Sequence, residues 1–267
     1  MGKTAFALQI AKNAAEFSNG VLIFSLEMPD IKLGGRYLSG ASGNTNNEIQ
    51  NGKCDIDHLV KTSYELIRLP IYIDDTSAIS VMEVRAKAMK FIIEKGIKLI
   101  IVDYLQLMSG EGDTREQVIA GISRDLKAVA KDLDIPVVAL SQLNRGVEQT
   151  SDKKPKLSDL RESGAIEQDA DAVMFVYRPA KYGIKEIEVE GASSDTRGVM
   201  DIIIEKNRSG PTGEILLRHN ESITNIYESE TSISDSVEDP FKADQDPLKL
   251  HPEYRHRDFD NDTDRSF

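Results

Sequence analysis

Leu99-Ile100-Ile101-Val102-Asp103 is a run of large apolar residues that ends in a carboxylate. Its apolar residues follow one another without the polar alternation of a strand that has one wet face. A strand buried on both faces, as in a parallel sheet, has this continuous pattern. Comparable runs occur at residues 21–26, 69–73, 98–103, 136–141 and 172–177. Together they predict a parallel sheet whose two faces are covered.

The segments between these runs have helical periodicity. The clearest helices are predicted over residues 3–17, 81–95 and 115–133. Ser80 with Glu83 three residues later matches a capping box, and Thr114 is placed to cap the third helix. Strands that alternate with helices indicate an α/β fold with a mostly parallel sheet.

The pattern changes in the last third of the chain. Residues 187–190, 199–206 and 214–218 predict an antiparallel C-terminal extension, with Gly210-Pro211-Thr212-Gly213 as a turn. Beyond Ile226 the chain is rich in Asp, Ser and Pro and poor in apolar residues, which is typical of disorder. We therefore predict one domain over residues 1–226 and an acidic, disordered tail over residues 227–267.

The composition excludes several classes of protein. No stretch approaches the roughly 18 consecutive apolar residues of a membrane span, and the N-terminus has no secretory cleavage pattern. The single cysteine, Cys54, excludes an internal disulfide framework. We expect a cytoplasmic protein without a membrane partner.

The formal net charge of -12 argues at first against a nucleic-acid partner, because phosphate binding usually requires a basic surface. However, residues 228–267 hold twelve Asp and Glu against five Lys and Arg, so the tail carries much of this charge. A ring-shaped protein can also keep its cations in a central channel, since salt screens charges beyond about 10 Å.

Gly2-Lys3-Thr4 opens the first predicted helix and matches the second half of a phosphate-binding loop. In such a loop Lys3 would neutralise the β- and γ-phosphates, and the Thr4 hydroxyl would hold Mg²⁺. The tripeptide alone is a weak signal, and an ordinary helix start is the alternative. The strand before such a loop and its first glycine are absent, so we expect an incomplete loop.

Asp103 follows an apolar strand, at the place where a carboxylate would order Mg²⁺ and its waters. Glu27 comes just after the run 21–26 and could polarise the water that attacks a γ-phosphate. Gln142 follows the run 136–141 and could contact the γ-phosphate. Each residue also has a structural interpretation. Asp103 could be the first residue of a turn, Glu27 could cap the next helix, and Gln142 could be a solvated turn residue. In a doubly wound sheet the carboxyl ends of neighbouring strands form one ligand site, which favours the functional interpretation.

Two basic elements remain. One is the long polar segment 144–163, whose cations are Arg145, Lys153, Lys154, Lys156 and Arg161. The other is the pair Lys206 and Arg208, which could reach the nucleotide of a neighbouring subunit and stabilise transition-state charge. Charged runs are usually solvated surface, and this is the alternative for both elements.

Several motifs are more specific than this general chemistry. They are Ser25-Leu26-Glu27-Met28, Ile71-Tyr72-Ile73-Asp74-Asp75-Thr76, Val102-Asp103-Tyr104-Leu105-Gln106-Leu107-Met108, Leu140-Ser141-Gln142-Leu143-Asn144-Arg145, and residues 159–171, which begin Asp159-Leu160-Arg161-Glu162-Ser163-Gly164. In their sequences and in their order along the chain, these motifs resemble those of the bacterial replicative DNA helicases of the DnaB type. The resemblance runs from Met1 to about Arg218.

The resemblance implies a RecA-like P-loop NTPase core that hydrolyses ATP with Mg²⁺. It implies a hexameric ring that moves 5′ to 3′ on single-stranded DNA, with primase and a helicase loader as further partners. By similarity the phosphate loop contains Gly2, Lys3 and Thr4. The other implied roles are water activation by Glu27, Mg²⁺ binding by Asp103, γ-phosphate sensing by Gln142, action in trans by Lys206 and Arg208, and DNA-backbone contact by Arg161, Glu162 and Gly164.

Two departures from the family pattern leave an alternative open. The chain lacks the start of the phosphate loop, the strand before it, the linker helix and the N-terminal collar domain of the family, and Gly34-Gly35 interrupts the helix after Glu27. We therefore keep a truncated, non-catalytic helicase-like subunit or gene fragment with weak ATP binding as the alternative to a working motor. The sequence from Asp159 to Gly164 argues against a recombinase or a clock-type ATPase.

Overall fold

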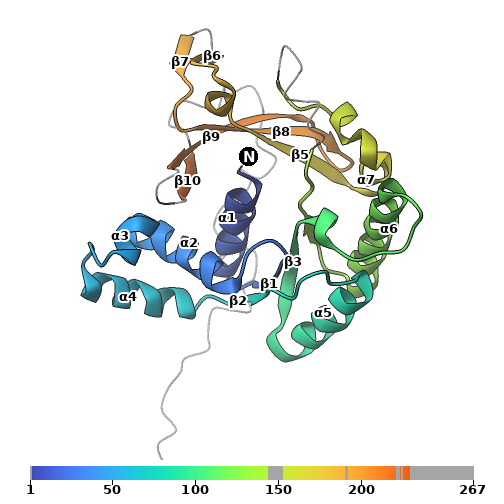
Figure 1. The fold of residues 1–267 in the computed structure, drawn as a ribbon, viewed down its shortest axis with the longest axis horizontal. Helices are drawn as coiled ribbons and strands as arrows, with labels where there is room; N and C mark the ends of the chain where they lie inside the picture. Colours follow the sequence, from blue (N-terminus) through green and yellow to red (C-terminus); the bar gives the residue numbers. More distant parts are fainter. Residues whose placement is uncertain (1, 144–152, 190–191, 221–222, 224, 229–267) are drawn as a thin grey trace, which may run out of the picture. The chain divides into compact units, whose positions relative to one another are not determined.

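The computed structural model describes residues 2–143, 153–189, 192–220, 223 and 225–228 (Figure 1). Most of the predicted tail, residues 229–267, lies outside the described residues. The final strand, β10 (Asn225–Glu228), includes the first residues that we assigned to the tail. The division into domain and tail therefore stays a prediction.

A parallel sheet forms the first half of the fold, as predicted. Its strands are β1 (Gly20–Ser25), β2 (Ile71–Asp74), β3 (Ile97–Asp103) and β4 (Val137–Ala139), in the order β2-β1-β3-β4. β1 is buried along its whole length, and β3 is buried except at Lys98, in agreement with their continuous apolar sequences. Because Ser25 pairs with Asp103, the carboxyl ends of the two central strands lie side by side.

Helices cover both faces of this sheet (Figure 1). Apolar residues of α1 (Lys3–Glu16) and α2 (Asp30–Ser42) pack on the face that contains Val21 and Ile23. Those of α5 (Val81–Lys95) and α6 (Arg115–Leu133) pack on the opposite face, against Leu22 and Phe24. Burial of these two apolar layers drives the assembly of the sheet with its helices.

Local capping explains where the helices of the second layer begin. The Ser80 hydroxyl accepts a hydrogen bond from the Glu83 amide, and the Glu83 carboxylate accepts one from the Ser80 amide. Thr114 makes the same reciprocal pair with Gln117 at the start of α6. Both caps satisfy amide groups that the first helical turn leaves unpaired, which confirms the predicted starts.

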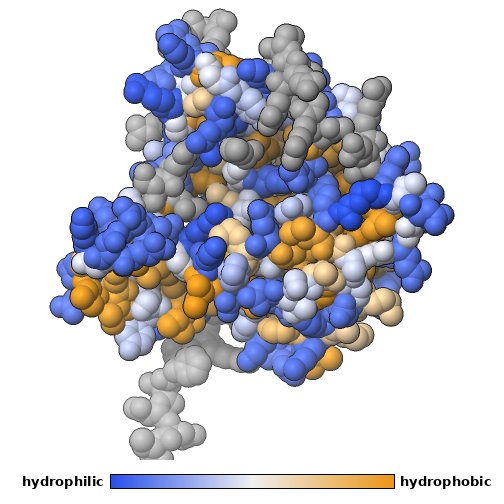
Figure 2. All heavy atoms as spheres, viewed as in Figure 1, coloured by the Kyte–Doolittle hydropathy of each residue, from blue (hydrophilic) through white to orange (hydrophobic). Residues whose placement is uncertain are grey.

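Two further helices, α3 (Asn46–Gln50) and α4 (Ile56–Ile67), follow α2. α4 exposes a stripe of apolar side chains at helical spacing, formed by Ile56, Val60, Tyr64 and Ile67. Figure 2 shows apolar surface in this region. Among the described residues, no helix combines the length and the apolar character needed to cross a membrane.

The second sheet is antiparallel, with the order β10-β9-β8-β5. It contains β5 (Ala172–Tyr177), β8 (Val199–Asn207), β9 (Gly213–Asn220) and β10, and the predicted turn 210–213 joins β8 to β9. A separate hairpin consists of β6 (Glu186–Val189) and β7 (Ala192–Asp195). Ala5 and Phe6 of α1 pack against Met200 and Ile202 of β8, so α1 contacts both sheets.

The expectation for residues 172–177 was wrong in one respect. We placed this run in the parallel sheet with both faces buried, but β5 pairs antiparallel with β8. Its residues alternate in burial, and the Met174 side chain is 51% exposed. The face of β5 with Val173, Phe175 and Tyr177 is buried in a hydrophobic cluster with Leu160 and Ile203, whereas the opposite face is only partly covered, with Val176 packed near Met200. An apolar run does not reveal how many of its faces find a partner.

Candidate functional site

Polar side chains from several elements converge at the carboxyl end of the parallel sheet. The Thr4 hydroxyl of α1 donates a hydrogen bond of 2.7 Å to Asp103 Oδ2 at the end of β3. The Leu26 amide donates to the Asp103 carbonyl at 2.8 Å, which brings the chain just before Glu27 to the same place. The parallel pairing of β1 and β3 is the reason, because it aligns the ends of both strands.

Lys3 lies between this carboxylate and the end of β4. Its ammonium donates a hydrogen bond of 2.7 Å to the Ser141 carbonyl and lies 5.2 Å from the centre of the Tyr104 ring. Burial lowers the pKa of Lys3, while the charges of Asp103 and Glu27 act in the opposite direction. Both carboxylates are therefore near enough to Lys3 to influence it electrostatically.

Asp103 is the most buried charged group of the site, with 4% of its surface exposed. Burial raises the pKa of Asp103, and the negative charge of Glu27 adds to this effect. The hydrogen bond from Thr4 and the positive charges of Lys3 and Arg36 lower the pKa but do not cancel the effect of burial. A further cation beside Asp103 would therefore be electrostatically favourable.

The donor atoms at this position fit Mg²⁺. Thr4 and Asp103 offer adjacent oxygen atoms, and Mg²⁺ is commonly held by one or two carboxylates together with substrate phosphates and water. The described residues contain no group of three or more His, Cys, Asp or Glu side chains that could hold a metal ion unaided. With two protein oxygens, the arrangement suits a metal ion that is also held by a phosphate ligand and water.

Gln142 is held at the end of β4 by a partner that we did not predict. The Gln142 amide donates to Gln106 Oε1 at 3.1 Å, and Gln106 Nε2 donates to Ser141 Oγ at 2.9 Å. Arg115 of α6 donates to the Gln106 carbonyl. Gln106 thus connects the segment after β3 with the segment after β4, and the Gln142 side chain is exposed.

Gly2 caps α1 in a conformation that favours glycine, with φ at 103°. A Cβ atom there would lie 3.2 Å from Arg178 Cδ and 3.2 Å from Met200 Cε. Residue 2 therefore lies against the second sheet, and it has no room for a side chain unless these neighbours shift.

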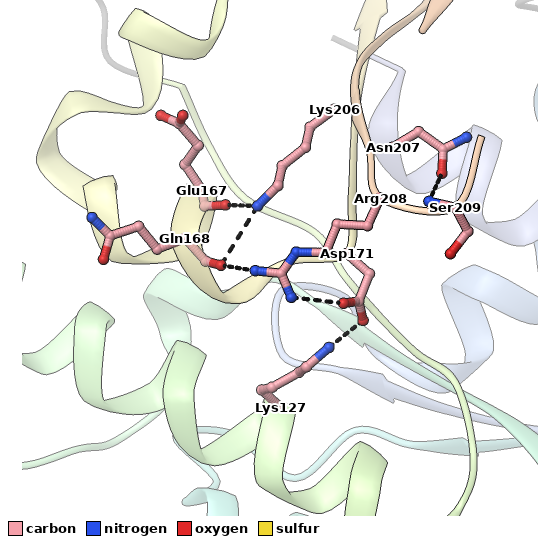
Figure 3. Close-up of polar contacts among 8 residues, drawn as sticks. All are labelled: Lys127, Glu167, Gln168, Asp171, Lys206, Asn207, Arg208 and Ser209. Carbon is pink, nitrogen blue, oxygen red and sulfur yellow. Dashed lines mark hydrogen bonds and ion pairs between the residues drawn. The ribbon is translucent and has the colours of Figure 1, made fainter. Parts of the chain in front are cut away.

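Lys206 and Arg208 contact the short helix α7 (Gly164–Asp169), as Figure 3 shows. Lys206 donates to the carbonyl of Glu167, and Arg208 donates to that of Gln168 at 2.8 Å. Arg208 also pairs with Asp171 at 3.2 Å. The structure does not place this pair among the residues that surround Lys3.

The predicted DNA-contacting residues lie at the junction of η3 (Leu157–Ser163) and α7. The backbone of this junction is described, but the side chains of Arg161 and Glu162 lie outside the described part of the chain. Gly164 is exposed and has open space where a side chain would be. Of the other predicted cations, Arg145 lies outside the described residues, and Lys154 pairs with Glu214 at 2.7 Å.

Comparison with known protein families identifies the family of this chain. The model of the DnaB-like helicase C terminal domain matches residues 1–228. The chain belongs to this family. The predicted resemblance to the DnaB family and the predicted α/β fold class are thereby confirmed.

Curated members of the DnaB-like family are closely similar to this chain. A replicative DNA helicase DnaB of Buchnera aphidicola subsp. Schizaphis graminum is 47% identical over 228 residues, which cover 82% of this chain and 47% of that protein. One of Geobacillus stearothermophilus is 46% identical over 225 residues, which cover 81% and 48%. The chain thus spans about half the length of the curated relatives it matches.

Two solved structures have a similar fold. The "ATPase Domain of G40P" superposes with a TM-score of 0.78 at 36% identity, over 86% of this chain and 81% of that chain. "The Structure Of A DnaB-Like Replicative Helicase And Its Interactions With Primase" also superposes with a TM-score of 0.78, at 37% identity, over 86% and 55%.

Within this DnaB-like domain, sequence reasoning missed several site residues. They are Ser141, Tyr104, Gln106, Arg36 and Asp171. Tyr104 and Gln106 could have been suspected, because they follow directly on a strand that ends in a candidate metal ligand. The Ser141 group is a backbone carbonyl, and no side-chain pattern can signal it.

Proposed function

We propose that this chain is the ATP-driven motor of a replicative DNA helicase. The observation that carries the proposal is the convergence of Lys3, Thr4, Asp103 and the end of β1 before Glu27 at one edge of a parallel sheet. Membership of the DnaB-like family and the named activity of its curated relatives support it.

The residues have distinct roles in this proposal. The α1 N-terminus and the Lys3 ammonium bind the β- and γ-phosphates of ATP, because amide dipoles and a cation both stabilise anionic oxygens. Lys3 would exchange the Ser141 carbonyl for phosphate oxygens. Thr4 and Asp103 would hold Mg²⁺, which neutralises phosphate charge when it is bound.

Glu27 is the residue to which we assign activation of the attacking water. It is exposed just after β1, and its negative charge acts to raise the pKa of both Lys3 and Asp103. A carboxylate in this place can accept a proton from water as the water attacks the γ-phosphate. Gln142, which follows β4, would contact the γ-phosphate. This contact would link the presence of the γ-phosphate to the basic segment 144–163 that comes next in the chain.

The proposed roles of Lys206, Arg208 and the DNA-contacting residues require several copies of the chain to assemble. Lys206 and Arg208 would act on the nucleotide of a neighbouring subunit, where a positive charge stabilises the transferring phosphoryl group. Arg161, Glu162 and Gly164 would contact the backbone of single-stranded DNA in a hexameric ring that moves 5′ to 3′. Primase and a helicase loader are proposed partners of the longer protein, and the name of one related structure includes primase.

A substitution at Glu27 tests the enzymatic part. Glu27→Gln should leave binding of a fluorescent ATP analogue unchanged and lower phosphate release by about a hundredfold or more, because it removes only the proton acceptor. Glu94→Gln, an exposed change on α5, is the matched control and should alter neither. Undiminished hydrolysis by Glu27→Gln would remove Glu27 from this role. Weak ATP binding without any turnover in the unsubstituted chain would favour the non-catalytic alternative, and tight ATP binding would count against it.

A further inference from the structure

The cations Lys206 and Arg208 are held by one short segment of their own chain. The Arg208 guanidinium donates to the Gln168 carbonyl at 2.8 Å and to Asp171 Oδ1 at 3.2 Å, and the Arg208 amide donates to the Asp171 carbonyl at 2.9 Å. Lys206 donates to the Glu167 carbonyl and, at 3.5 Å, to that of Gln168. Figure 3 shows the bonds of the two side chains meeting at the end of α7 and at Asp171.

The acceptors suit cations. The last carbonyls of a helix have no partner within the helix and carry partial negative charge, so ammonium and guanidinium groups are favoured there. Asp171 adds a full negative charge, and Lys127 of α6 forms an ion pair with the same carboxylate. The charges of Lys127 and Arg208 both lower the pKa of Asp171, which keeps it ionised at neutral pH.

These contacts contribute little to stability. The side chains of Arg208 and Asp171 are 51% and 61% exposed, and exposed ion pairs are worth about 0–1 kcal/mol. They do hold Arg208 in place, because its guanidinium is bonded to Gln168 of α7 and to Asp171, and its backbone amide is also bonded to Asp171. Asp171 also ties this position to α6 through Lys127.

The same short helix begins where the DNA-contacting residues are assigned. η3 ends at Ser163 and α7 starts at Gly164 without a break. Gly164, which we assign to DNA, is the first residue of α7, and the carbonyls of Glu167 and Gln168 that hold Lys206 and Arg208 lie about one helical turn later in the same helix. A displacement of η3 by a bound strand would be passed along a single rigid turn to the two cations.

We propose that Asp171 is a positioning residue, which with α7 sets the place of Lys206 and Arg208 and thereby links DNA binding to ATP hydrolysis. The inference rests on the proposed function. Asp171 touches neither substrate, and it acts through Arg208. In this role it transmits the state of the DNA-contacting segment to cations that serve a neighbouring nucleotide.

Asp171→Asn tests the inference, with Asp132→Asn as the matched control. The Asp132 side chain is also exposed, and it forms an ion pair with Arg85, a residue that we assign neither to DNA nor to the nucleotide. A single-stranded thymidine oligonucleotide should raise the kcat for ATP in the unsubstituted chain. Asp171→Asn should reduce this stimulation by about fivefold or more, while the KM for ATP and the Kd for the oligonucleotide change by less than about twofold.

The conservative variant and a second measurement separate positioning from general damage. Asp171→Glu keeps the charge and should recover at least part of the stimulation, and Asp132→Asn should behave like the unsubstituted chain. Hydrogen exchange of the Arg208 amide should change on oligonucleotide binding in the unsubstituted chain and less in Asp171→Asn.

Full stimulation in Asp171→Asn, or a loss of oligonucleotide affinity in parallel with the loss of stimulation, would overturn the inference. Neither result would affect the proposed function. By contrast, an unsubstituted chain that neither binds ATP nor responds to the oligonucleotide would overturn the proposed function, and the inference with it.

Discussion

At the scale of single residues, the site is a balance of opposed electrostatic effects on one carboxylate. Burial and the charge of Glu27 disfavour the ionised form of Asp103, whereas Thr4, Lys3 and Arg36 favour it. The Thr4 hydroxyl is the direct partner, at 2.7 Å. Its hydrogen bond supports the charge that a divalent cation requires.

Removal of the Thr4 hydroxyl should therefore weaken the use of Mg²⁺. Thr4→Val keeps the shape of the side chain but loses the donor to Asp103 and the second oxygen ligand. Hydrogen bonds to charged groups contribute about 1.5–3 kcal/mol, so the Mg²⁺ concentration for half-maximal ATP hydrolysis should rise by about tenfold or more. Thr4→Ser retains the hydroxyl and serves as the control. An unchanged Mg²⁺ requirement in Thr4→Val would contradict the assignment.

At the scale of elements, β8 has a buried, mostly apolar first half and a polar end that carries Lys206. Its first half is buried, and Met200 and Ile202 pack towards α1 while Ile203 packs on the opposite face. Asp201 lies in this buried half, 3.6 Å from Lys154. The end of β8 carries Lys206, whose ammonium reaches α7. A buried centre anchors the strand so that its polar end keeps a defined place.

Asp201 predicts a pH-dependent stability of this strand. It is 4% exposed, and burial, helped by the charge of Glu214, raises its pKa to about 6 against the opposing effect of Lys154. Since the folded pKa exceeds the ordinary value of 3.8, the favourable contribution is complete below that value and is lost as pH rises through about 6. Asp201→Asn should therefore stabilise the fold at pH 8, by on the order of 2 kcal/mol, and have little effect near pH 4.

Unfolding in urea at the two pH values measures this effect. Asp195→Asn is the control of opposite sign, because hydrogen bonds from Arg197 lower the pKa of Asp195 and its carboxylate stabilises the fold only when it is ionised. That variant should be destabilised at the higher pH. Equal stability changes at both pH values in Asp201→Asn would show that the charge of residue 201 is immaterial.

At the scale of the whole molecule, α1 joins the site to the second sheet. Its outer residues pack on β8, while the residues at its start form the Lys3 and Thr4 part of the site. Lys206 and Arg208 lie on the second sheet and its following turn, and within one chain they are bonded to α7. The proposed function therefore needs a second copy to complete each site.

A mixing experiment tests this requirement. Glu27→Gln and Arg208→Ala should each be nearly inactive alone, because each removes one side of every shared site. When they are mixed before assembly, about a quarter of head-to-tail interfaces would combine an intact Glu27 with an intact Arg208. Up to that fraction of ATP hydrolysis should return. A mixture as inactive as its two components would argue that Arg208 acts within its own subunit.

The sequence by itself determined the elements whose signals are local. α5 and α6 begin and end where the patterns predicted them, and their starts are fixed locally because Ser80 and Thr114 cap their own helices within one turn. The continuous apolar runs likewise located β1 and β3, and their terminal residues located Glu27 and Asp103. These features depend on residues that are close together in the chain.

Only the tertiary structure decided which distant groups meet. The pairing of β5 with β8, the Ser141 carbonyl beside Lys3 and the bonds from Arg208 to Asp171 and Gln168 all join residues far apart in sequence. Periodicity reports which face of an element is apolar, but not which partner covers that face. The partner is selected when side chains pack together, and packing is a property of the assembled sheets and helices.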